Sequence, residues 1–271
     1  MSLDDNRIVR LFAELRAKKR KTLLPFVTAG YPSLAATAAI LKRFEAIGVR
    51  VCELGVPFTD PIADGPVIQN SYTEALAAGT TTDQIFDVIG DYRAAGGDLA
   101  LLAMVSYSII YRHGPRGFIA RAAAAGIDGL IVPDLPVDES ASTEALASEA
   151  GLALVLLIAP TTPPERQARI ARHSRGFIYY ISVAGITGER DSLPDETIAA
   201  VTELRTHTDT PVCVGFGISN PRTVEQVCRV ADGAIVGSAI VRRMTDLKDA
   251  PPAELAEKVG GFVAELFGPV K

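Results

Sequence analysis

The sequence lacks tryptophan and has few residues of the kinds that build disulfide frameworks or metal sites. Its 271 residues include three cysteines and three histidines. Cys52 and Cys213 lie in apolar, strand-like runs and Cys228 lies in a helical pattern, so no pair has metal-ligand spacing. The histidines are scattered outside these runs and form no zinc ligand set. We therefore expect small buried cysteines, a reducing compartment and no metal.

Lysine, basic clusters and long apolar runs are also scarce. None of the seven lysines lies at the end of a strand-like run, which disfavours a Schiff-base enzyme. The net charge is −5, and we interpret the basic cluster at 16–21 as a solvated helix end, not a nucleic-acid interface. No apolar run approaches the roughly 18 residues that span a bilayer, and the polar N-terminus lacks a signal-peptide core. We expect a cytoplasmic protein without membrane or nucleic-acid partners.

Eight short apolar runs recur along the chain, each followed by a turn and a helical pattern. The runs are Leu23–Thr28, Val51–Leu54, Leu99–Ser106, Gly129–Pro133, Ala153–Ala159, Phe177–Ser182, Pro211–Gly215 and Gly233–Gly237. Alternating strands and helices predict a parallel sheet with right-handed crossovers, and eight units predict a closed (β/α)8 TIM barrel. An open doubly wound sheet would usually carry a glycine fingerprint after its first strand, which residues 29–32 do not form. We expect one domain over residues 1–271.

Several helix ends are marked by local sequence. Ser33 precedes an Ala-rich stretch, and Asn220 precedes a proline that suits a first helical position. In Thr162-Pro163-Pro164-Glu165 a cap residue is followed by proline and then by glutamate. Gly126 and Gly151 follow alanines at the ends of helical patterns, so each predicts a helix stop.

Carboxylates gather at the end of the second apolar run. Glu53 occupies a strand end, where barrels place catalytic groups, and burial there would raise its pKa. An ion pair with an arginine is the alternative. An extended loop, residues 56–80, follows and contains Asp60 and Asp64, although Asp-Pro and Asp-Gly also form turns. Asp134, after the fourth run, is equally open to either interpretation.

Two adjacent tyrosines lie in the sixth run. Tyr179 alternates with Phe177 and Ile181, and Tyr180 lies on the opposite face of the strand. One of the two tyrosines therefore faces the barrel interior, where an ordinary core role is the default expectation.

Glycine-rich turns follow the last two runs. Gly215-Phe216-Gly217 follows the seventh and Gly237-Ser238-Ala239 the eighth, and barrels often bind phosphate at these two loops. Glycine lets the backbone approach the ligand, while N–H groups at a helix start point at the anion. The turn at 185–188 would form a third wall. The alternative is that these glycines serve only tight turns.

The most specific text is ELGVPFTDPIADGPVIQ, residues 53–69, which closely resembles the signature of the tryptophan synthase alpha subunit family. Further similar stretches follow in order from the first strand to the last. They are residues 25–30, 132–136, 185–188, 215–219 and 233–241.

The resemblance implies retro-aldol cleavage of indole-3-glycerol phosphate to indole and glyceraldehyde 3-phosphate, a lyase step of tryptophan biosynthesis. It assigns the proton transfers to Glu53 and Asp64. It assigns Phe26, Met104, Ile131 and Phe216 to the indole pocket, Tyr179 to the substrate pocket, Thr187 to ordering of the sixth loop, and Gly188, Gly217, Gly237 and Ser238 to the phosphate.

The residue chemistry suits this reaction independently. Cleavage of the carbon–carbon bond needs an electron sink, and no suitable lysine is present to supply one. Protonation of indole C3 would create the sink inside the substrate. A strand-end glutamate can move that proton, and a loop aspartate near the indole N–H can stabilise the positive charge that develops.

The resemblance also implies a partner, a beta subunit that binds pyridoxal phosphate and assembles with this chain as an α2β2 heterotetramer with allosteric coupling. The coupling would run through the loop that contains Asp60 and Pro61. This chain itself would bind no cofactor.

Some positions depart from the family pattern. In the loop predicted after the third run, Ser108 and Ile109 stand where Asn-Pro usually follows a tyrosine, which bears on coupling to the partner. Ala184 replaces a common serine, and Glu189 replaces a common alanine, which bears on closure of the sixth loop.

Three alternatives stay open. Another phosphate-binding barrel of histidine or tryptophan biosynthesis would usually carry Asp, Cys or Lys at its first strand end, where this chain has Thr28. A regulatory subunit would keep the fold without catalysis. A stand-alone lyase would release free indole without a partner.

Overall fold

Eight parallel strands form the centre of the molecule in the computed structural model, which describes residues 5–62, 64–182, 193–215 and 217–268. They close into a barrel in sequence order, with β8 paired to β1. The strands are β1 (Thr22–Thr28), β2 (Val51–Gly55), β3 (Ala100–Met104), β4 (Gly129–Ile131), β5 (Ala153–Ile158), β6 (Ile178–Ile181), β7 (Val212–Gly215) and β8 (Gly233–Val236). The predicted TIM barrel is confirmed.

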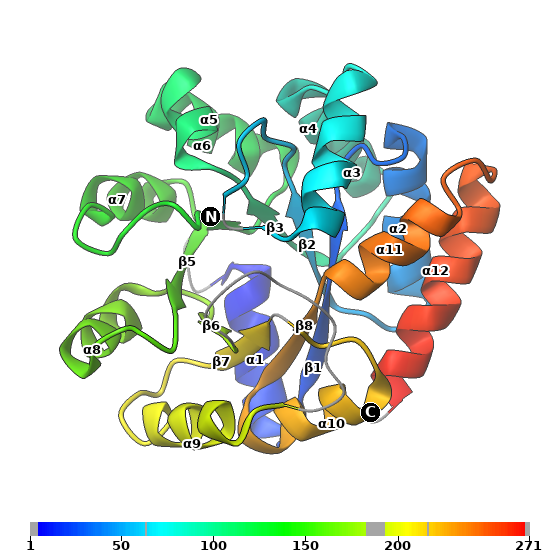
Figure 1. Cartoon of the computed structure of the whole chain (residues 1–271). Helices are drawn as coiled ribbons and strands as arrows, with labels where there is room; N and C mark the ends of the chain where they lie inside the picture. The colour runs from blue at the N-terminus through cyan, green and yellow to red at the C-terminus, as the bar shows by residue number, and fades with distance from the viewer. Residues whose placement is uncertain (1–4, 63, 183–192, 216, 269–271) are drawn as a thin grey trace.

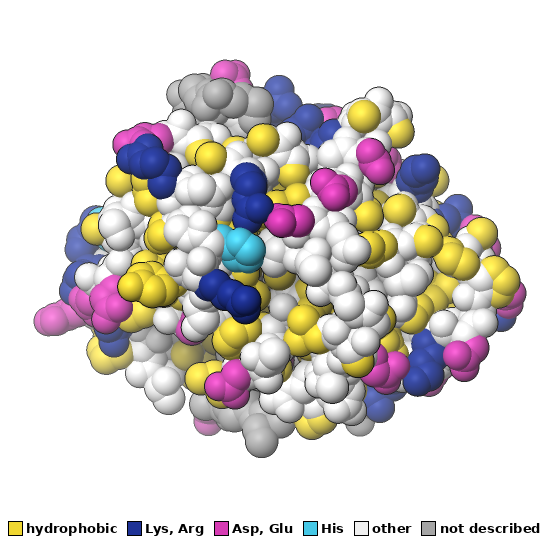
Figure 2. Space-filling view, turned by 90° about the horizontal axis from the view of Figure 1, so that it is seen from above, with side chains coloured by type: hydrophobic (Ala, Val, Ile, Leu, Met, Phe, Trp, Pro, Cys, Tyr) yellow, Lys and Arg dark blue, Asp and Glu magenta, His cyan; other side chains and the backbone are white. Residues whose placement is uncertain are grey.

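Helices surround the strands as a ring, with α1 across one end of the barrel (Figure 1). Those described are α1 (Arg7–Ala17), α2 (Leu34–Ala46), α3 (Pro66–Ala77), α4 (Thr82–Ala94), α5 (Tyr107–Arg112), α6 (Pro115–Ala125), α7 (Ala141–Glu149), α8 (Pro164–His173), α9 (Asp195–Leu204), α10 (Pro221–Val230), α11 (Ser238–Asp246) and α12 (Pro252–Phe267). None of these helices is long and apolar enough to cross a membrane. On the face seen in Figure 2, acidic and basic side chains are interspersed with apolar ones.

Strand side chains alternate between two hydrophobic clusters, because successive residues of a strand point to opposite faces. One cluster fills the space between the strands and the surrounding helices. The other, here called the interior cluster, fills the barrel. Its residues in the strands, or directly before one in the case of Phe177, include Leu24, Phe26, Val51, Leu102, Met104, Ile131, Val155, Phe177, Tyr179, Cys213 and Ile235. Tyr179 therefore faces the interior and Tyr180 packs outside, as the alternation in the sequence predicts.

The helix α1 closes the end of the barrel where the strands begin. Its apolar face, which includes Ile8 and Phe12, belongs to the interior cluster. The rings of Phe12 and Phe177 lie 5.5 Å apart between centroids. Because α1 fills this end, the opposite end, where the strands finish, is the open mouth of the barrel.

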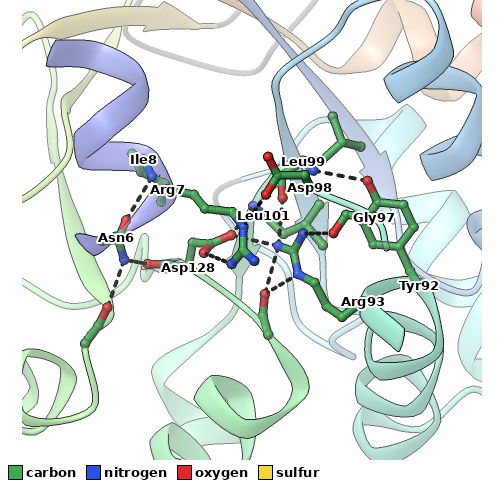
Figure 3. A network of polar contacts seen from close by, with 12 residues as sticks. Asn6, Arg7, Ile8, Tyr92, Arg93, Gly97, Asp98, Leu99, Leu101 and Asp128 are labelled. Carbon is green, nitrogen blue, oxygen red and sulfur yellow. Dashed lines mark hydrogen bonds and ion pairs between the residues drawn. The ribbon is translucent and has the colours of Figure 1, made fainter. Parts of the chain in front are cut away.

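A polar network stabilises the closed end (Figure 3). Asp128 accepts hydrogen bonds from Arg93 Nη2 at 2.8 Å and from Arg7 Nη1 at 3.0 Å, and its carboxylate is 1 % exposed. Asn6 Nδ2 donates to the carbonyl oxygens of Asp128 and Gly151 at 2.6 and 2.8 Å. The network joins α1, α4 and the strand β4 at the end of the barrel opposite the mouth.

Most of the predicted helix ends are confirmed. Ser33 Oγ accepts from the N–H of Ala36 at 3.1 Å, and Asn220 Oδ1 accepts from Thr223 N–H at 3.0 Å. The predicted cap at Thr162 is wrong. The α8 helix is preceded by Pro163 without a side-chain cap, and Thr162 Oγ1 instead accepts from the N–H of Ala159 at 3.0 Å, so it folds back toward β5.

Two segments interpreted as loops contain helices. The stretch 56–80 contains α3, so the irregular connection after β2 ends at Gly65. The segment after β3 forms α5, whose start is capped by Ser106. Short helices of this kind draw their stability from tertiary contacts, which local sequence does not display.

Candidate active site

Glu53 is a buried carboxylic acid inside the barrel. It lies in the middle of β2, between Phe26 of β1 and Leu102 of β3, and it is 0 % exposed. Neither carboxylate oxygen has a hydrogen-bond partner among the described residues, which disfavours the predicted alternative of an arginine ion pair. Burial raises the pKa of Glu53 well above its ordinary value. A protonated carboxyl at this position can donate a proton and then take one back.

Asp64 approaches the same mouth from the β2–α3 loop. It is partly buried, and burial raises its pKa to about 6. Its position is fixed through its backbone, because Gln69 Nε2 donates to the Asp64 carbonyl at 2.8 Å and the Asp64 N–H donates to the Pro61 carbonyl at 3.1 Å. Because its pKa is about 6, the Asp64 carboxyl is ionised at neutral pH.

Two tyrosine hydroxyls lie near both carboxylates. Tyr72 comes from α3 and Tyr179 from β6, and burial followed by the charges of Asp64 and Glu53 raises the pKa of each phenol well above its ordinary value. Residues on four different elements, β2, the β2–α3 loop, α3 and β6, thus converge on one space. Tyr179 faces the barrel interior, and the substrate-pocket role that the resemblance implies for it stays a prediction.

Interior-facing glycines make room for these tyrosines. A Cβ at Gly55 would lie 2.5 Å from Tyr72 Oη and 2.4 Å from Phe26 Cζ, and one at Gly215 would lie 2.4 Å from Tyr179 Oη. Contacts this short essentially do not occur in folded proteins, so a side chain at either glycine would have to displace the aromatic ring beside it. The space that a side chain would fill is occupied by the tyrosines.

Apolar side chains surround the two carboxylates. Phe26, Met104 and Ile131 all belong to the interior cluster and lie on neighbouring strands, since Met104 pairs with Ile131 in the register of β3 and β4. The structure therefore brings together three of the four residues predicted for the indole pocket. The fourth, Phe216, lies outside the described residues.

The turns after β7 and β8 supply backbone groups suited to an anion. The helix α11 begins at Ser238 directly after Gly237, and the first N–H groups of a helix have no partner within it. Gly217 has φ of 77°, a conformation that favours glycine. Gly237, Ser238 and Gly217 thus follow adjacent strands, as a phosphate site requires. Thr187 and Gly188, with the turn at 185–188 and the departures Ala184 and Glu189, lie outside the described residues.

The loop that carries Asp64 also reaches the outer surface. Asp60 and Ile62 are exposed, and Ile62 has 84 % of its surface exposed, which is unusual for a large apolar side chain. A cavity of 170 Å³ lies between this loop and the segments that follow β3 and β4. Its lining residues include Asp60, Asp64, Tyr72, Met104 and Asp134. One short segment therefore connects the mouth of the barrel with its exterior.

Asp134 has a structural role. Its carboxylate accepts from Ser106 Oγ at 2.7 Å and from the N–H of Tyr107 at 2.8 Å. It therefore ties the end of β4 to the first turn of α5. Tyr107 opens that helix, where Ser108 and Ile109 depart from the family pattern.

The positions that other chemistries would use are occupied differently. Thr28 Oγ1 at the first strand end lies 2.6 Å from Ser71 Oγ, so it anchors α3. The three cysteines are free thiols. Among the described residues, no group of three or more His, Cys, Asp or Glu side chains could hold a metal ion.

Sequence reasoning missed Tyr72 and Gln69. Ile68 and Tyr72 are spaced four residues apart on α3 and both enter the interior cluster. That spacing would have indicated a helix face turned toward the mouth if residues 66–77 had been interpreted as a helix. No local pattern marks Gln69, because its acceptors are backbone carbonyls.

Comparisons with known proteins agree on one family. The family model described as tryptophan synthase alpha chain matches residues 12–264. The tryptophan synthase alpha chain of Rhodopirellula baltica is 45 % identical over 266 residues, covering 94 % of this chain and 95 % of that protein.

Solved structures are similar over most of the chain. The alpha subunit of tryptophan synthase from Legionella pneumophila has a TM-score of 0.88 at 31 % identity, covering 98 % of each chain. A chain of the tryptophan synthase complex from Pyrococcus furiosus has a TM-score of 0.82 at 33 % identity, covering 92 % of this chain and 99 % of that one.

Proposed function

Since the chain belongs to the family of tryptophan synthase alpha chains, we propose that Glu53 and Asp64 carry the proton chemistry of its reaction. The chain is a lyase of tryptophan biosynthesis that cleaves indole-3-glycerol phosphate to indole and glyceraldehyde 3-phosphate. The observation that carries the proposal is the buried Glu53 carboxyl, which lies inside the barrel in the middle of β2 and lacks a hydrogen-bond partner among the described residues.

Glu53 acts first as an acid and then as a base. Its protonated carboxyl gives a proton to indole C3, which breaks the aromaticity of the pyrrole ring and leaves a positive charge on the ring nitrogen. The electrons of the bond between C3 and the glycerol carbon then flow into the ring as the bond breaks. The carboxylate takes the hydroxyl proton from the same glycerol carbon as it becomes an aldehyde. One proton is given and one is recovered, so Glu53 ends each cycle as it began.

Asp64 supplies the negative charge that this step needs. The positive charge develops on the indole nitrogen, and an ionised carboxylate accepting the N–H stabilises it where water is excluded. The pKa of about 6 leaves Asp64 ionised at neutral pH, and burial raises the pKa of Glu53 well above its ordinary value, which favours its protonated form. Two carboxyl groups with different surroundings thus take opposite roles at one pH.

The remaining contacts hold the substrate. Phe26, Met104, Ile131 and Phe216 surround the indole ring, and the Tyr179 side chain borders the reacting carbons. Gly217, Gly237 and Ser238 bind the phosphate through backbone N–H groups, with Gly188, and Thr187 orders the sixth loop over the site. Closure of that loop excludes water from the reacting groups.

The family also places this chain in a partnership with a beta subunit, and the substrate is phosphorylated. We further propose an α2β2 heterotetramer in the cytoplasm, with pyridoxal phosphate held only by the beta subunit. Asp60 and Pro61 face that partner, in keeping with the exposure of Asp60 and Ile62.

Indole release from indole-3-glycerol phosphate tests the proposal. The purified chain is assayed alone and with a tryptophan synthase beta subunit, beside Glu53→Gln and Asp64→Asn. We expect weak turnover alone, a large increase with the partner, and loss in both variants. High turnover alone identifies a stand-alone lyase. Absence of turnover in both conditions contradicts the lyase assignment and favours a regulatory subunit.

A further inference from the structure

Gln69 connects the first turn of α3 to the loop that carries Asp64. Its Nε2 donates to the Asp64 carbonyl at 2.8 Å and to the Pro61 carbonyl at 3.2 Å. One side-chain amide thus satisfies two backbone acceptors on either side of a sharp bend. Gln69 is partly buried, so these bonds are shielded from water on one side.

The helix that holds Gln69 is itself firmly anchored. Ser71 Oγ donates to the Ile68 carbonyl at 2.7 Å and lies 2.6 Å from Thr28 Oγ1 of β1. Ile68 and Tyr72 are buried in the interior cluster. The first turns of α3 therefore belong to the rigid part of the barrel, and Gln69 transfers that rigidity to the loop.

Backbone hydrogen bonds tie the two ends of the loop to the barrel and to α3. Val56 N–H donates to the Met104 carbonyl at 2.8 Å, and the N–H groups of Ile68 and Gln69 donate to the Gly65 carbonyl at 3.1 and 3.0 Å. Asp64 N–H donates to the Pro61 carbonyl at 3.1 Å, and Ile62 N–H donates to the Asp60 carbonyl at 3.0 Å. These two bonds keep the bend folded, and its orientation relative to α3 depends on the Gln69 side-chain amide, which donates to the Pro61 and Asp64 carbonyls. The amide of Gln69 fixes that orientation, and with it the direction from which the Asp64 carboxylate enters the mouth.

We propose that Gln69 is a positioning residue that holds Asp64 against the indole ring and makes its placement respond to partner contacts at Asp60 and Ile62. This inference rests on the proposed function, which assigns Asp64 to the indole nitrogen. When the outer part of the loop shifts, the Pro61 carbonyl moves with it. Because Gln69 Nε2 donates to both carbonyls, the Asp64 carbonyl is displaced as well.

The chain contains a matched control. Gln167 stands in α8 one turn after Pro164, as Gln69 stands in α3 one turn after Pro66. Gln167 Nε2 donates to the carbonyl of Thr162, five residues earlier, at 2.8 Å. Gln69 likewise donates to a carbonyl five residues earlier. The Gln167 loop carries none of the proposed site residues, so Gln167→Met reports the cost of losing such a bond without the site.

The experiment compares Gln69→Met and the shorter Gln69→Asn with Gln167→Met, each in the full chain with and without the beta subunit. Methionine keeps the length and removes the donors. We expect kcat to fall about 10- to 100-fold in both Gln69 variants, as for a misplaced catalytic group, with little change in KM, because the phosphate contacts stay in place. Activation by the beta subunit should also shrink.

The pH profile separates positioning from simple destabilisation. A freed loop exposes Asp64 to water, so the acid limb of kcat/KM should move to lower pH in the Gln69 variants and stay in place in Gln167→Met. The titratable groups that share the mouth with Asp64 are Glu53, Asp60, Tyr72, Asp134 and Tyr179. They are unchanged in all three variants.

Equal kinetics and equal acid limbs in Gln69→Met, Gln69→Asn and Gln167→Met would overturn the inference. So would normal activation of the Gln69 variants by the beta subunit. If the unaltered chain fails to cleave indole-3-glycerol phosphate, the proposed function fails instead, so the two failures are distinct.

Discussion

Replacement of Glu53 by glutamine should abolish catalysis and at the same time change how stability depends on pH. In the folded chain, burial raises the pKa of this carboxyl well above the ordinary 4.5. In the unfolded chain the carboxyl ionises near that ordinary value. As pH rises above 4.5, the unfolded state therefore gains free energy by releasing a proton that the folded state retains. The unaltered chain loses stability over this window, and Glu53→Gln does not.

The size of the effect follows from linkage. Each pH unit across which Glu53 is protonated when folded and ionised when unfolded costs the unaltered chain about 1.4 kcal/mol. A carboxyl that stays protonated from pH 5 to pH 7 accumulates a difference of about 2.7 kcal/mol. Above the folded pKa the two curves run parallel again. Asp64 titrates with a raised pKa in both proteins, so its contribution cancels in the difference.

Urea unfolding at a series of pH values measures this difference directly. The free energy of unfolding of Glu53→Gln, less that of the unaltered chain, should rise steadily with pH above 4.5. A buried amide also needs partners, so the offset at low pH has either sign, and the slope is the quantity of interest. A difference that stays constant with pH would refute the account of Glu53 as a buried, protonated acid.

Three further outcomes are expected. The profile of kcat/KM against pH should be bell-shaped, with an acid limb near 6, because activity needs the Asp64 carboxylate ionised. An acid limb that persists in the residual activity of Asp64→Asn would contradict its assignment to Asp64. Gly55→Ala places a methyl 2.5 Å from Tyr72 Oη, so it should lower kcat/KM about tenfold or more and the free energy of unfolding by about 1–3 kcal/mol. The control Gly90→Ala, whose added Cβ has no neighbour within 4 Å, should be neutral or slightly stabilising. Asp128→Asn removes the carboxylate that pairs with Arg93 and one of the two that pair with Arg7, and it should cost about 3 kcal/mol in thermal or urea unfolding. We expect kcat and KM to be preserved, because that network lies at the closed end of the barrel.

The barrel is predictable from sequence because its strands are buried on both faces. Each appears as a short apolar run of the kind expected for a parallel sheet, and each of the eight predicted runs overlaps a strand of the structure. The helices α3 and α5 were missed for a related reason. The helix α3 packs on the interior cluster, and the start of α5 is bonded to the Asp134 carboxylate through the N–H of Tyr107. Both are contacts between distant parts of the chain.

The candidate site is likewise only partly predictable from sequence. The sequence identifies Glu53 as a carboxylate of the second strand, although the structure places it in the middle of β2 and not at the predicted strand end. The choice between an ion pair and an unpaired acid depends on which side chains surround it in space. The register of β1, β2 and β3 places Phe26 and Leu102 beside it, and no arginine pairs with it among the described residues. Gln69 donates to backbone carbonyls, which every residue has, so its hydrogen-bond partners can be identified only in the three-dimensional structure.

A carbon-13 NMR titration of the Glu53 carboxyl, with its resonance identified by its loss in Glu53→Gln, tests most directly whether this group is a buried acid. We predict a midpoint well above 4.5 that coincides with the alkaline limb of kcat/KM, because the same carboxyl must be protonated to begin the reaction. A midpoint at or below 4.5, or one unrelated to that limb, would contradict the central claim that one buried carboxyl both gives and takes the proton.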